Sequence, residues 1–248
     1  MQPHITRRRR SAPARLAMAL LAAGLAPAAW ATNGYFPHGF GLKAKGMGGA
    51  SIALAQDGFA GVNNPAAAMF SGSRMDIGAE IFRPYRDAQF VGQTPVVDSG
   101  RTAFLIPEFG YSAKLSERMA VGLTVYGNGG MNTSYAPFPN GVNLLGGQGK
   151  LGVDLMQVIV APTLAWQVAD GHALGVSPLL VLQRFEAYGL QAFAPQSSDP
   201  ANLTNRGKDS STGVGVRLGY FGQLGDRVTV GAAYSPKIRM SRFDKYRG

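Results

Sequence analysis

The sequence predicts an all-β protein, an antiparallel transmembrane β-barrel with an N-terminal segment folded inside it. Apolar residues alternate with small or polar residues along about seven segments, which is the pattern of strands with one apolar face. Short turns alternate with long loops between these segments, as is typical of barrels in bacterial outer membranes. Glycine fills 34 of the 248 positions and charged residues only 15%, a composition that suits neither a disordered chain nor a helical bundle.

Residues 1–31 are predicted to be a cleaved secretory signal peptide. The basic start contains Arg7, Arg8, Arg9, Arg10 and Arg15, and an apolar stretch and the small-x-small site Ala29-Trp30-Ala31 follow it. The apolar stretch has about ten residues, whereas a membrane anchor needs about twenty. We therefore expect export through the general secretory route, with a twin-arginine route as the alternative, to the outer membrane of a Gram-negative cell.

The charge and cysteine content exclude several classes of protein. The net charge falls from +10 to +5 once the five arginines of the leader are removed, and the remaining basic residues are scattered. We therefore expect no nucleic-acid partner. The chain has no cysteine, so neither disulfides nor thiolate metal sites can stabilise it. Only His4, His38 and His172 are available for histidine chemistry, and we expect no enzyme activity, no metal and no cofactor.

Residues 32–71 are predicted to form a plug, or hatch, inside the barrel. This segment runs from Asn33-Gly34-Tyr35 to Asn64-Pro65-Ala66, is rich in glycine and lacks a periodic apolar pattern. Such a segment cannot build its own core, so another part of the protein must enclose it. Pro65 fixes its backbone angle, and Asn64 can cap a turn or bond to the barrel wall. A plain tight turn is the alternative for these residues.

Residues 72–248 are predicted to supply barrel strands. The expected strands cover 73–83, 102–114, 118–127, 153–168, 172–187, 211–224 and 227–240. A soluble sandwich fits the alternation alone, but the long loops over 84–101, 128–152 and 188–210 favour the barrel. Single-chain bacterial barrels have an even number of strands, so we expect an incomplete barrel. A fragment, a premature stop, a frameshift and a self-paired oligomer all remain open.

Strand phase also predicts which charges face the lumen. Asp76, Glu80, Arg217 and Arg227 lie opposite the apolar faces of their strands. An arginine on the lipid face at mid-depth costs about 2–4 kcal/mol, so these side chains are expected to point inward. Arg217 there either binds a ligand carboxylate or braces the plug against the wall.

Several motifs resemble the start of the FadL-type outer-membrane transporters. These are Asn33-Gly34-Tyr35, Gly46-Met47-Gly48-Gly49-Ala50, Asp57 and the run 63–70, which contains Asn64-Pro65-Ala66. The resemblance implies a larger barrel with an N-terminal hatch that takes up long-chain fatty acids or aromatic hydrocarbons. The match covers the hatch and about half of the family's strands.

The resemblance also implies a route for the ligand. Extracellular loops capture it, a lumenal pocket near the N-terminus receives it, and it leaves sideways where the third strand kinks. The expected ligand-contacting residues are Asn33, Gly34, Tyr35, Phe36, Phe40, Phe59, Phe70 and Arg217, although each phenylalanine suits plain packing equally well. Gly127, Gly129 and Gly130 break the alternation of the third strand, so we expect the lateral opening there, with the start of a flexible loop as the alternative.

The sequence therefore predicts passive uptake of a hydrophobic small molecule. The other expected partners are outer-membrane lipid, lipopolysaccharide and the barrel-assembly machinery. A structural or adhesive barrel without transport, or a non-functional truncated fragment, is the alternative.

Overall fold

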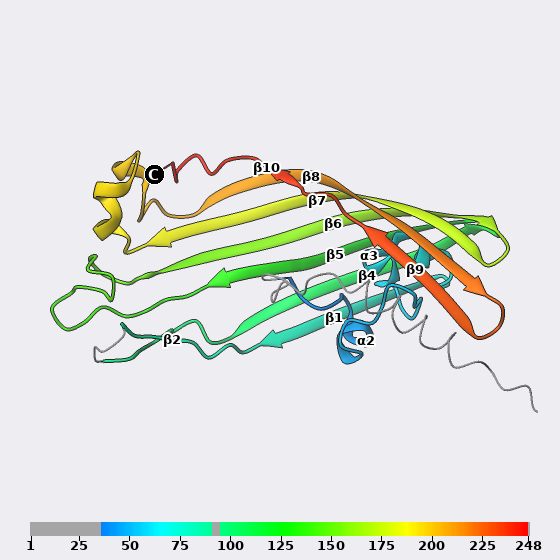
Figure 1. Cartoon of the computed structure of the whole chain (residues 1–248), viewed down its shortest axis with the longest axis horizontal. Helices are drawn as coiled ribbons and strands as arrows, with labels where there is room; N and C mark the ends of the chain where they lie inside the picture. The colour runs from blue at the N-terminus through cyan, green and yellow to red at the C-terminus, as the bar shows by residue number, and fades with distance from the viewer. Residues whose placement is uncertain (1–35, 91–94, 248) are drawn as a thin grey trace, which may run out of the picture. The chain divides into compact units, whose positions relative to one another are not determined.

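The computed structural model describes residues 36–90 and 95–247. In this part of the chain the architecture is all-β, with a curled antiparallel sheet and only short helices, as the sequence predicts (Figure 1). The expected signal peptide over 1–31 and the expected ligand contacts Asn33, Gly34 and Tyr35 lie outside the described residues.

One eight-stranded sheet contains all the long strands. They are β1 (Arg74–Phe82), β4 (Phe104–Ser116), β5 (Met119–Asn132), β6 (Gly152–Ala169), β7 (His172–Tyr188) and β8 (Asp209–Leu224), in that order, and β9 (Val228–Tyr234) and β10 (Arg239–Met240) both pair with β8. Each pair is antiparallel. Five of the seven expected strands therefore exist as single strands within two residues of their predicted ends.

Short turns join the strands at one end and long connections join them at the other (Figure 1). Gly171 and Gly225 have φ of 75° and 66°, the left-handed backbone that a tight turn requires. The first long connection contains the small hairpin of β2 (Asp87–Ala88) and β3 (Val97–Asp98). The third contains η2 (Gln191–Gln196) and η3 (Pro200–Asn202). This alternation matches the pattern of an outer-membrane barrel.

Two strand predictions need correction. The third strand, expected to end at Gly127, continues as β5 to Asn132 because 130–132 still pair with β6. The last expected strand, 227–240, is interrupted, since 235–238 leave β8 between β9 and β10. Pro236 lies in this interruption and has no N–H for a ladder hydrogen bond. Ser235 instead donates its hydroxyl to the carbonyl oxygen of Val216, at 3.1 Å.

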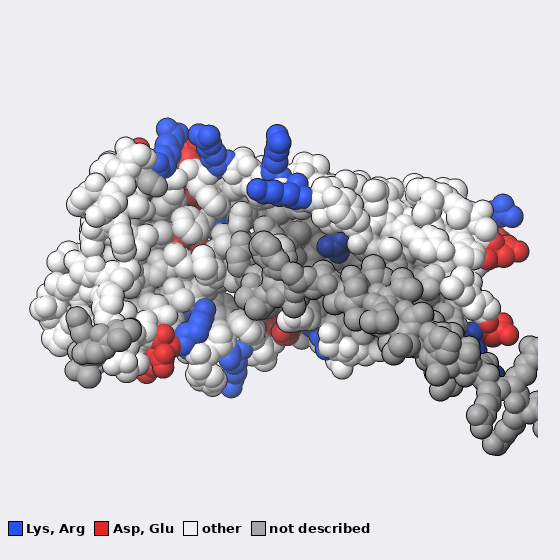
Figure 2. Space-filling model, in the orientation of Figure 1, with Lys and Arg blue, Asp and Glu red and all other residues white. Residues whose placement is uncertain are grey.

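The two faces of the sheet differ as the alternation predicts. On β1, Met75, Ile77 and Ile81 are 62–76% exposed, whereas Gly78 on the opposite face is buried. So large an exposed apolar surface fits contact with lipid rather than with water. Figure 2 shows one face of the molecule, on which most of the described surface carries neither basic nor acidic residues.

Residues 36–72 pack against the buried face of the sheet. They include α2 (Leu42–Gly46), α3 (Ala60–Asn63) and η1 (Pro65–Met69). The apolar residues of η1 share one cluster with Ala120, Ala165, Ala173 and Phe221 of the strands. Phe40, Phe59 and Val62 share a second cluster with strand residues that include Tyr126 and Leu179. This segment therefore has no core of its own and uses that of the sheet.

Glycines on the strands allow this close approach. A Cβ added to Gly110 of β4 would lie 2.7 Å from the carbonyl carbon of Gly58. A Cβ on Gly175 of β7 would meet Pro65 and Ala66 at less than 3 Å, and one on Gly219 of β8 would meet Asn64 in the same way. Part of the high glycine content is thus explained by backbone contact between the segment and the strands.

Candidate functional site

Asn64 connects the N-terminal segment to β8. Its side chain is fully buried, and Nδ2 donates to the carbonyl oxygens of Ile52 and Tyr220, both at 2.8 Å. Oδ1 accepts from the N–H of Ala66 at 3.1 Å and so caps η1, in which Pro65 is the first residue. The side chain thus makes both interactions that its position suggested, a cap and a bond to the wall.

Asn63 holds the segment together, a role that its position in the sequence does not indicate. Its Oδ1 accepts from the N–H of Phe40, and its Nδ2 donates to the carbonyl oxygen of Phe40, both at 2.9 Å. Nδ2 also donates to the carbonyl oxygen of Phe59 at 3.2 Å. A second asparagine beside Asn64 was the only signal available in the sequence.

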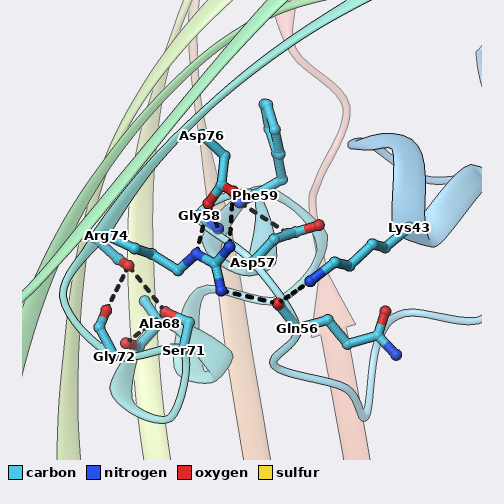
Figure 3. Close-up of polar contacts among 11 residues, drawn as sticks. Lys43, Gln56, Asp57, Gly58, Phe59, Ala68, Ser71, Gly72, Arg74 and Asp76 are labelled. Carbon is cyan, nitrogen blue, oxygen red and sulfur yellow. Dashed lines mark hydrogen bonds and ion pairs between the residues drawn. The ribbon is translucent and has the colours of Figure 1, made fainter.

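An arginine–aspartate pair on β1 contacts the segment (Figure 3). Nε and Nη2 of Arg74 donate to the two carboxylate oxygens of Asp76, at 2.6 and 2.7 Å. Oδ2 of Asp76 also accepts from the N–H of Gly58 at 2.7 Å. The carbonyl oxygen of Gln56 accepts from Nη1 of Arg74 at 3.2 Å and from Nζ of Lys43 at 2.9 Å. Asp76 therefore faces inward as predicted, where it orders the backbone of 56–58.

A second ionic contact involves Lys45 of α2. Its Nζ lies 2.6 Å from Oε2 of Glu80 on β1 and 2.5 Å from Oε1 of Glu108 on β4. The side chain of Glu108 is 1% exposed, and its Oε2 accepts from the N–H of Gly41 at 3.2 Å. Burial by itself lowers the pKa of Lys45, but the hydrogen bonds and charges of Glu108 and Glu80 outweigh it and raise that pKa. The inward direction predicted for Glu80 is confirmed.

Asp57 is a buried carboxylate within the segment. It is 7% exposed, and its Oδ1 accepts from the N–H of Phe59 at 3.0 Å. Burial raises the pKa of Asp57, and the hydrogen bond from Phe59 opposes this shift. The segment therefore contains one acidic group that is more stable when protonated than an exposed aspartate would be.

The expected ligand-contacting residues lie in different surroundings. Phe40 packs on Tyr126 of β5 with ring centroids 4.2 Å apart, and Phe70 packs on Phe221 of β8 at 4.9 Å. Phe59 is 3% exposed, whereas Phe36 is 51% exposed. The structure thus brings Phe40 and Phe59 into one packed cluster and leaves Phe36 outside it.

Two inward-facing arginines were expected, and only one is found. Arg217 of β8 points to the segment, where its Nη1 donates to the carbonyl oxygen of Val62. The prediction that Arg227 faces inward is wrong, because this residue lies in the exposed turn between β8 and β9, where strand phase does not apply.

A buried polar group lies on β5. Tyr126 is 1% exposed, and its hydroxyl has no hydrogen-bond partner among the described residues.

The glycines of β5 coincide with an irregularity in the sheet. Gly127 pairs with Val158 and Gly130 with Met156, so β5 contains one residue more than β6 over this stretch. This is a β-bulge, and Gly129 within it has φ of 106°. Nδ2 of Asn128 donates to Oε1 of Gln157 across the bulge at 2.7 Å.

The ladder between β4 and β5 ends beside this bulge. Its last pair toward the long loops is Glu108 with Tyr126. β4 nevertheless continues to pair with β1 as far as Phe104, and β5 continues to pair with β6 as far as Asn132. Residues 104–107 and 127–132 are therefore adjacent strand ends without a ladder between them.

The described residues offer little for metal chemistry. Within 36–90 and 95–247, no group of three or more His, Cys, Asp or Glu side chains is placed to hold a metal ion. In the same part of the chain, no helix combines the length and the apolar character needed to cross a membrane.

Comparison with known families gives one match over most of the chain. The sequence model described as "Outer membrane protein transport protein (OMPP1/FadL/TodX)" matches residues 21–248. None of the curated proteins matches the chain.

Several solved structures share the fold. The toluene transporter TodX of P. putida superposes with a TM-score of 0.67 at 19% identity, over 84% of this chain and 57% of TodX. A FadL homologue of Pseudomonas aeruginosa gives 0.54 at 21% identity, over 77% and 49%. The monoaromatic hydrocarbon channel CymD gives 0.52 at 20% identity, over 83% and 53%. The chain thus spans about half the length of these structures.

Proposed function

The chain belongs to the OMPP1/FadL/TodX family of outer membrane transport proteins, and from this we propose that it forms part of a passage for hydrophobic molecules with a lateral exit into the membrane. It is a β-barrel protein of the Gram-negative outer membrane that serves transport rather than catalysis. In the proposed route, the loops capture the ligand, a lumenal pocket beside segment 36–72 receives it, and it leaves through the wall.

The broken ladder between β4 and β5 is the observation that carries this proposal. Closed barrels leave no unpaired strand edges in lipid, since each buried unsatisfied backbone group costs several kcal/mol. Residues 104–107 and 127–132 lack a shared ladder, and Pro107 has no N–H to contribute to one. We infer that the wall opens here, next to Gly127, Gly129 and Gly130.

A lateral exit suits a hydrophobic ligand for an energetic reason. Burial of each methylene is worth about 0.8 kcal/mol, so an apolar molecule enters a greasy pocket readily and leaves it for water only slowly. An exit into lipid avoids water altogether. Segment 36–72 then acts as a hatch, because its ties to β1, β4 and β8 block a straight aqueous path.

The proposed pocket lies where the segment meets the wall. Phe40 and Phe59 supply apolar surface, and Asn33, Gly34 and Tyr35 precede them in the chain. Arg217 and the hydroxyl of Tyr126 are polar groups at the same level. Because TodX is a toluene transporter and CymD a monoaromatic hydrocarbon channel, we propose aromatic hydrocarbons and long-chain fatty acids as the ligands to test.

A reversible cross-link tests the lateral exit. A Cβ built on Gly127 lies 2.9 Å from Cγ2 of Ile106, so the Cβ atoms of Ile106→Cys and Gly127→Cys come within reach of the ~3.8 Å separation of a disulfide. The natural chain has no cysteine to interfere. With the double variant expressed in whole cells, we expect oxidation to stop uptake of labelled toluene or oleate and reduction to restore it.

A matched pair provides the control. Ala113 and Val121 are direct partners in the closed part of the same ladder, so joining Ala113→Cys to Val121→Cys adds a bond without closing any gap. Uptake should be the same before and after oxidation of this pair. Undiminished uptake through the oxidised Ile106→Cys/Gly127→Cys protein would refute the lateral route.

A further inference from the structure

The exposed face of β7 changes character along the strand. Leu180 and Leu182 are 49% and 48% exposed, and strand alternation puts Arg184, Glu186 and Tyr188 on the same face. β7 has 17 residues, whereas about nine to eleven cross the hydrocarbon layer. The charged part of this face therefore lies beyond the apolar part, toward the long loops.

The neighbouring strands change in the same way. On β6, Met156 is 43% exposed. Asp154 lies two residues nearer the loops, directly opposite Glu186 in the register of the two strands. On β8, Val214 is 70% exposed, and Nζ of Lys208, just before the strand, lies 3.9 Å from Oδ2 of Asp154. A band of exposed apolar side chains thus ends at a row of charges that crosses three strands.

A cavity of about 710 Å³ adjoins this row, among the loops and strand ends. Its lining includes Arg101, Lys150, Glu186 and Tyr188. The nearest ion pair, between Nη2 of Arg101 and Oδ2 of Asp154, is long at 3.4 Å, and the arginine side chain is 48% exposed. The side chains of Lys150 and Glu186 have no hydrogen bond or ion pair with any described residue. The cavity therefore offers the unused ammonium group of Lys150 beside the unused carboxylate of Glu186, whereas the Tyr188 hydroxyl already donates to the carbonyl oxygen of Thr133 at 2.7 Å and is left to accept.

We propose that this cavity, the rim site (Arg101, Lys150, Glu186 and Tyr188), binds the phosphorylated sugar headgroup of a glycolipid in the surrounding outer leaflet. Arginine and lysine donate charge-assisted hydrogen bonds to phosphate. The carboxylate of Glu186 repels a bare phosphate but accepts hydrogen bonds from sugar hydroxyls. The rim site therefore fits a ligand that carries a phosphate and a sugar together. The acyl chains of such a lipid lie along the apolar band of Leu180 and Leu182. This inference is independent of the proposed passage.

Lipid retention by the purified full chain in detergent micelles tests the rim site. The probes are purified lipopolysaccharide, the same lipid after phosphatase treatment, phosphatidylglycerol and free glucosamine 1-phosphate. We expect the phosphorylated glycolipid to bind best and Arg101→Gln with Lys150→Gln to weaken its binding about tenfold. Glu186→Gln should reduce the difference between the amounts of lipopolysaccharide and phosphatidylglycerol that the protein retains.

The matched control removes two cations from the opposite end of the sheet. Arg118 and Arg227 lie in exposed turns, so Arg118→Gln with Arg227→Gln should leave retention unchanged. Folding is checked by heat-dependent electrophoretic mobility, and Lys150→Gln alone replaces the double variant if that one misfolds. The proposal would be overturned by an equal loss of lipid retention in the control. It would also be overturned if the dephosphorylated lipid, phosphatidylglycerol or free glucosamine 1-phosphate bound as tightly as lipopolysaccharide.

Discussion

Single polar residues hold segment 36–72 to the strands. Asn64 uses both hydrogens of its amide and one acceptor in a fully buried position. Lys45 bridges two carboxylates, and Arg217 donates to the backbone of α3. Each of these groups would be costly to bury without its partner, so they specify one docked position of the segment.

Asp57 is the residue for which we predict a pH effect. Its pKa is raised in the folded protein, so the charged form destabilises the docked segment, and stability increases as the pH falls through that raised pKa. Asn keeps the acceptor for the N–H of Phe59 without the charge. We expect Asp57→Asn to slow amide exchange in 60–69 roughly threefold near pH 7. The variant should also lose the increase in stability that we expect for the natural protein as the pH falls.

Hydrogen exchange followed by mass spectrometry measures this effect, and Asp87→Asn on the exposed hairpin strand β2 is the control. An unchanged pH dependence of exchange in Asp57→Asn would show that another group is responsible.

At the scale of elements, the bulge in β5 decides how the sheet pairs. The extra residue between Gly127 and Gly130 reverses the phase of the strand and accompanies the end of its ladder with β4. An interruption also divides β9 from β10. Register shifts also occur beside the short turns, between Lys114 and Ser116 of β4 and between Gln167 and Ala169 of β6.

Deletion of Gly129 is predicted to restore the alternation of β5. The strand would then be free to pair with 104–107, and we expect slower amide exchange there together with lower ligand uptake. Deletion of Ala201, an exposed residue of η3, is the control and should change neither quantity. Fast exchange at 104–107 after deletion of Gly129 would contradict the role given to the bulge.

At the scale of the whole molecule, segment and sheet form one packed unit. Contacts join residues more than 150 positions apart, such as Asn64 with Tyr220 and Arg217 with Val62. Glycines of β4, β7 and β8 provide the space for them. The sheet alone would present these glycines and an empty inner face, so segment and wall depend on each other for burial.

Gly219→Ala is predicted to loosen this packing. The new methyl group would lie under 3 Å from Asn64 and Pro65, and overpacking of this kind typically costs 1–3 kcal/mol, so we expect a loss of about 2 kcal/mol. Gly46→Ala is the matched control, because a Cβ there has no neighbour within 4 Å. Thermal unfolding measures both variants, and equal stability of the two would refute the role of Gly219.

Much of the fold was predictable because strand alternation is local. The period-two pattern alone located the strands and the inward side of Asp76, Glu80 and Arg217. It failed for Arg227 because a turn has no strand phase, and it overlooked Glu108 and Asn63, whose partners lie 63 and 23 positions away. Spacing in the sequence carries no signal for such contacts.

The sequence by itself determined most of the strands, their two faces, the lack of a separate core in segment 36–72 and the glycines at the bulge, since each depends on neighbouring residues only. The tertiary structure alone decided where the segment docks, which ladder ends at Tyr126 and which charges line the rim site. These features depend on close approaches between distant parts of the chain, and only the folded chain brings those parts together.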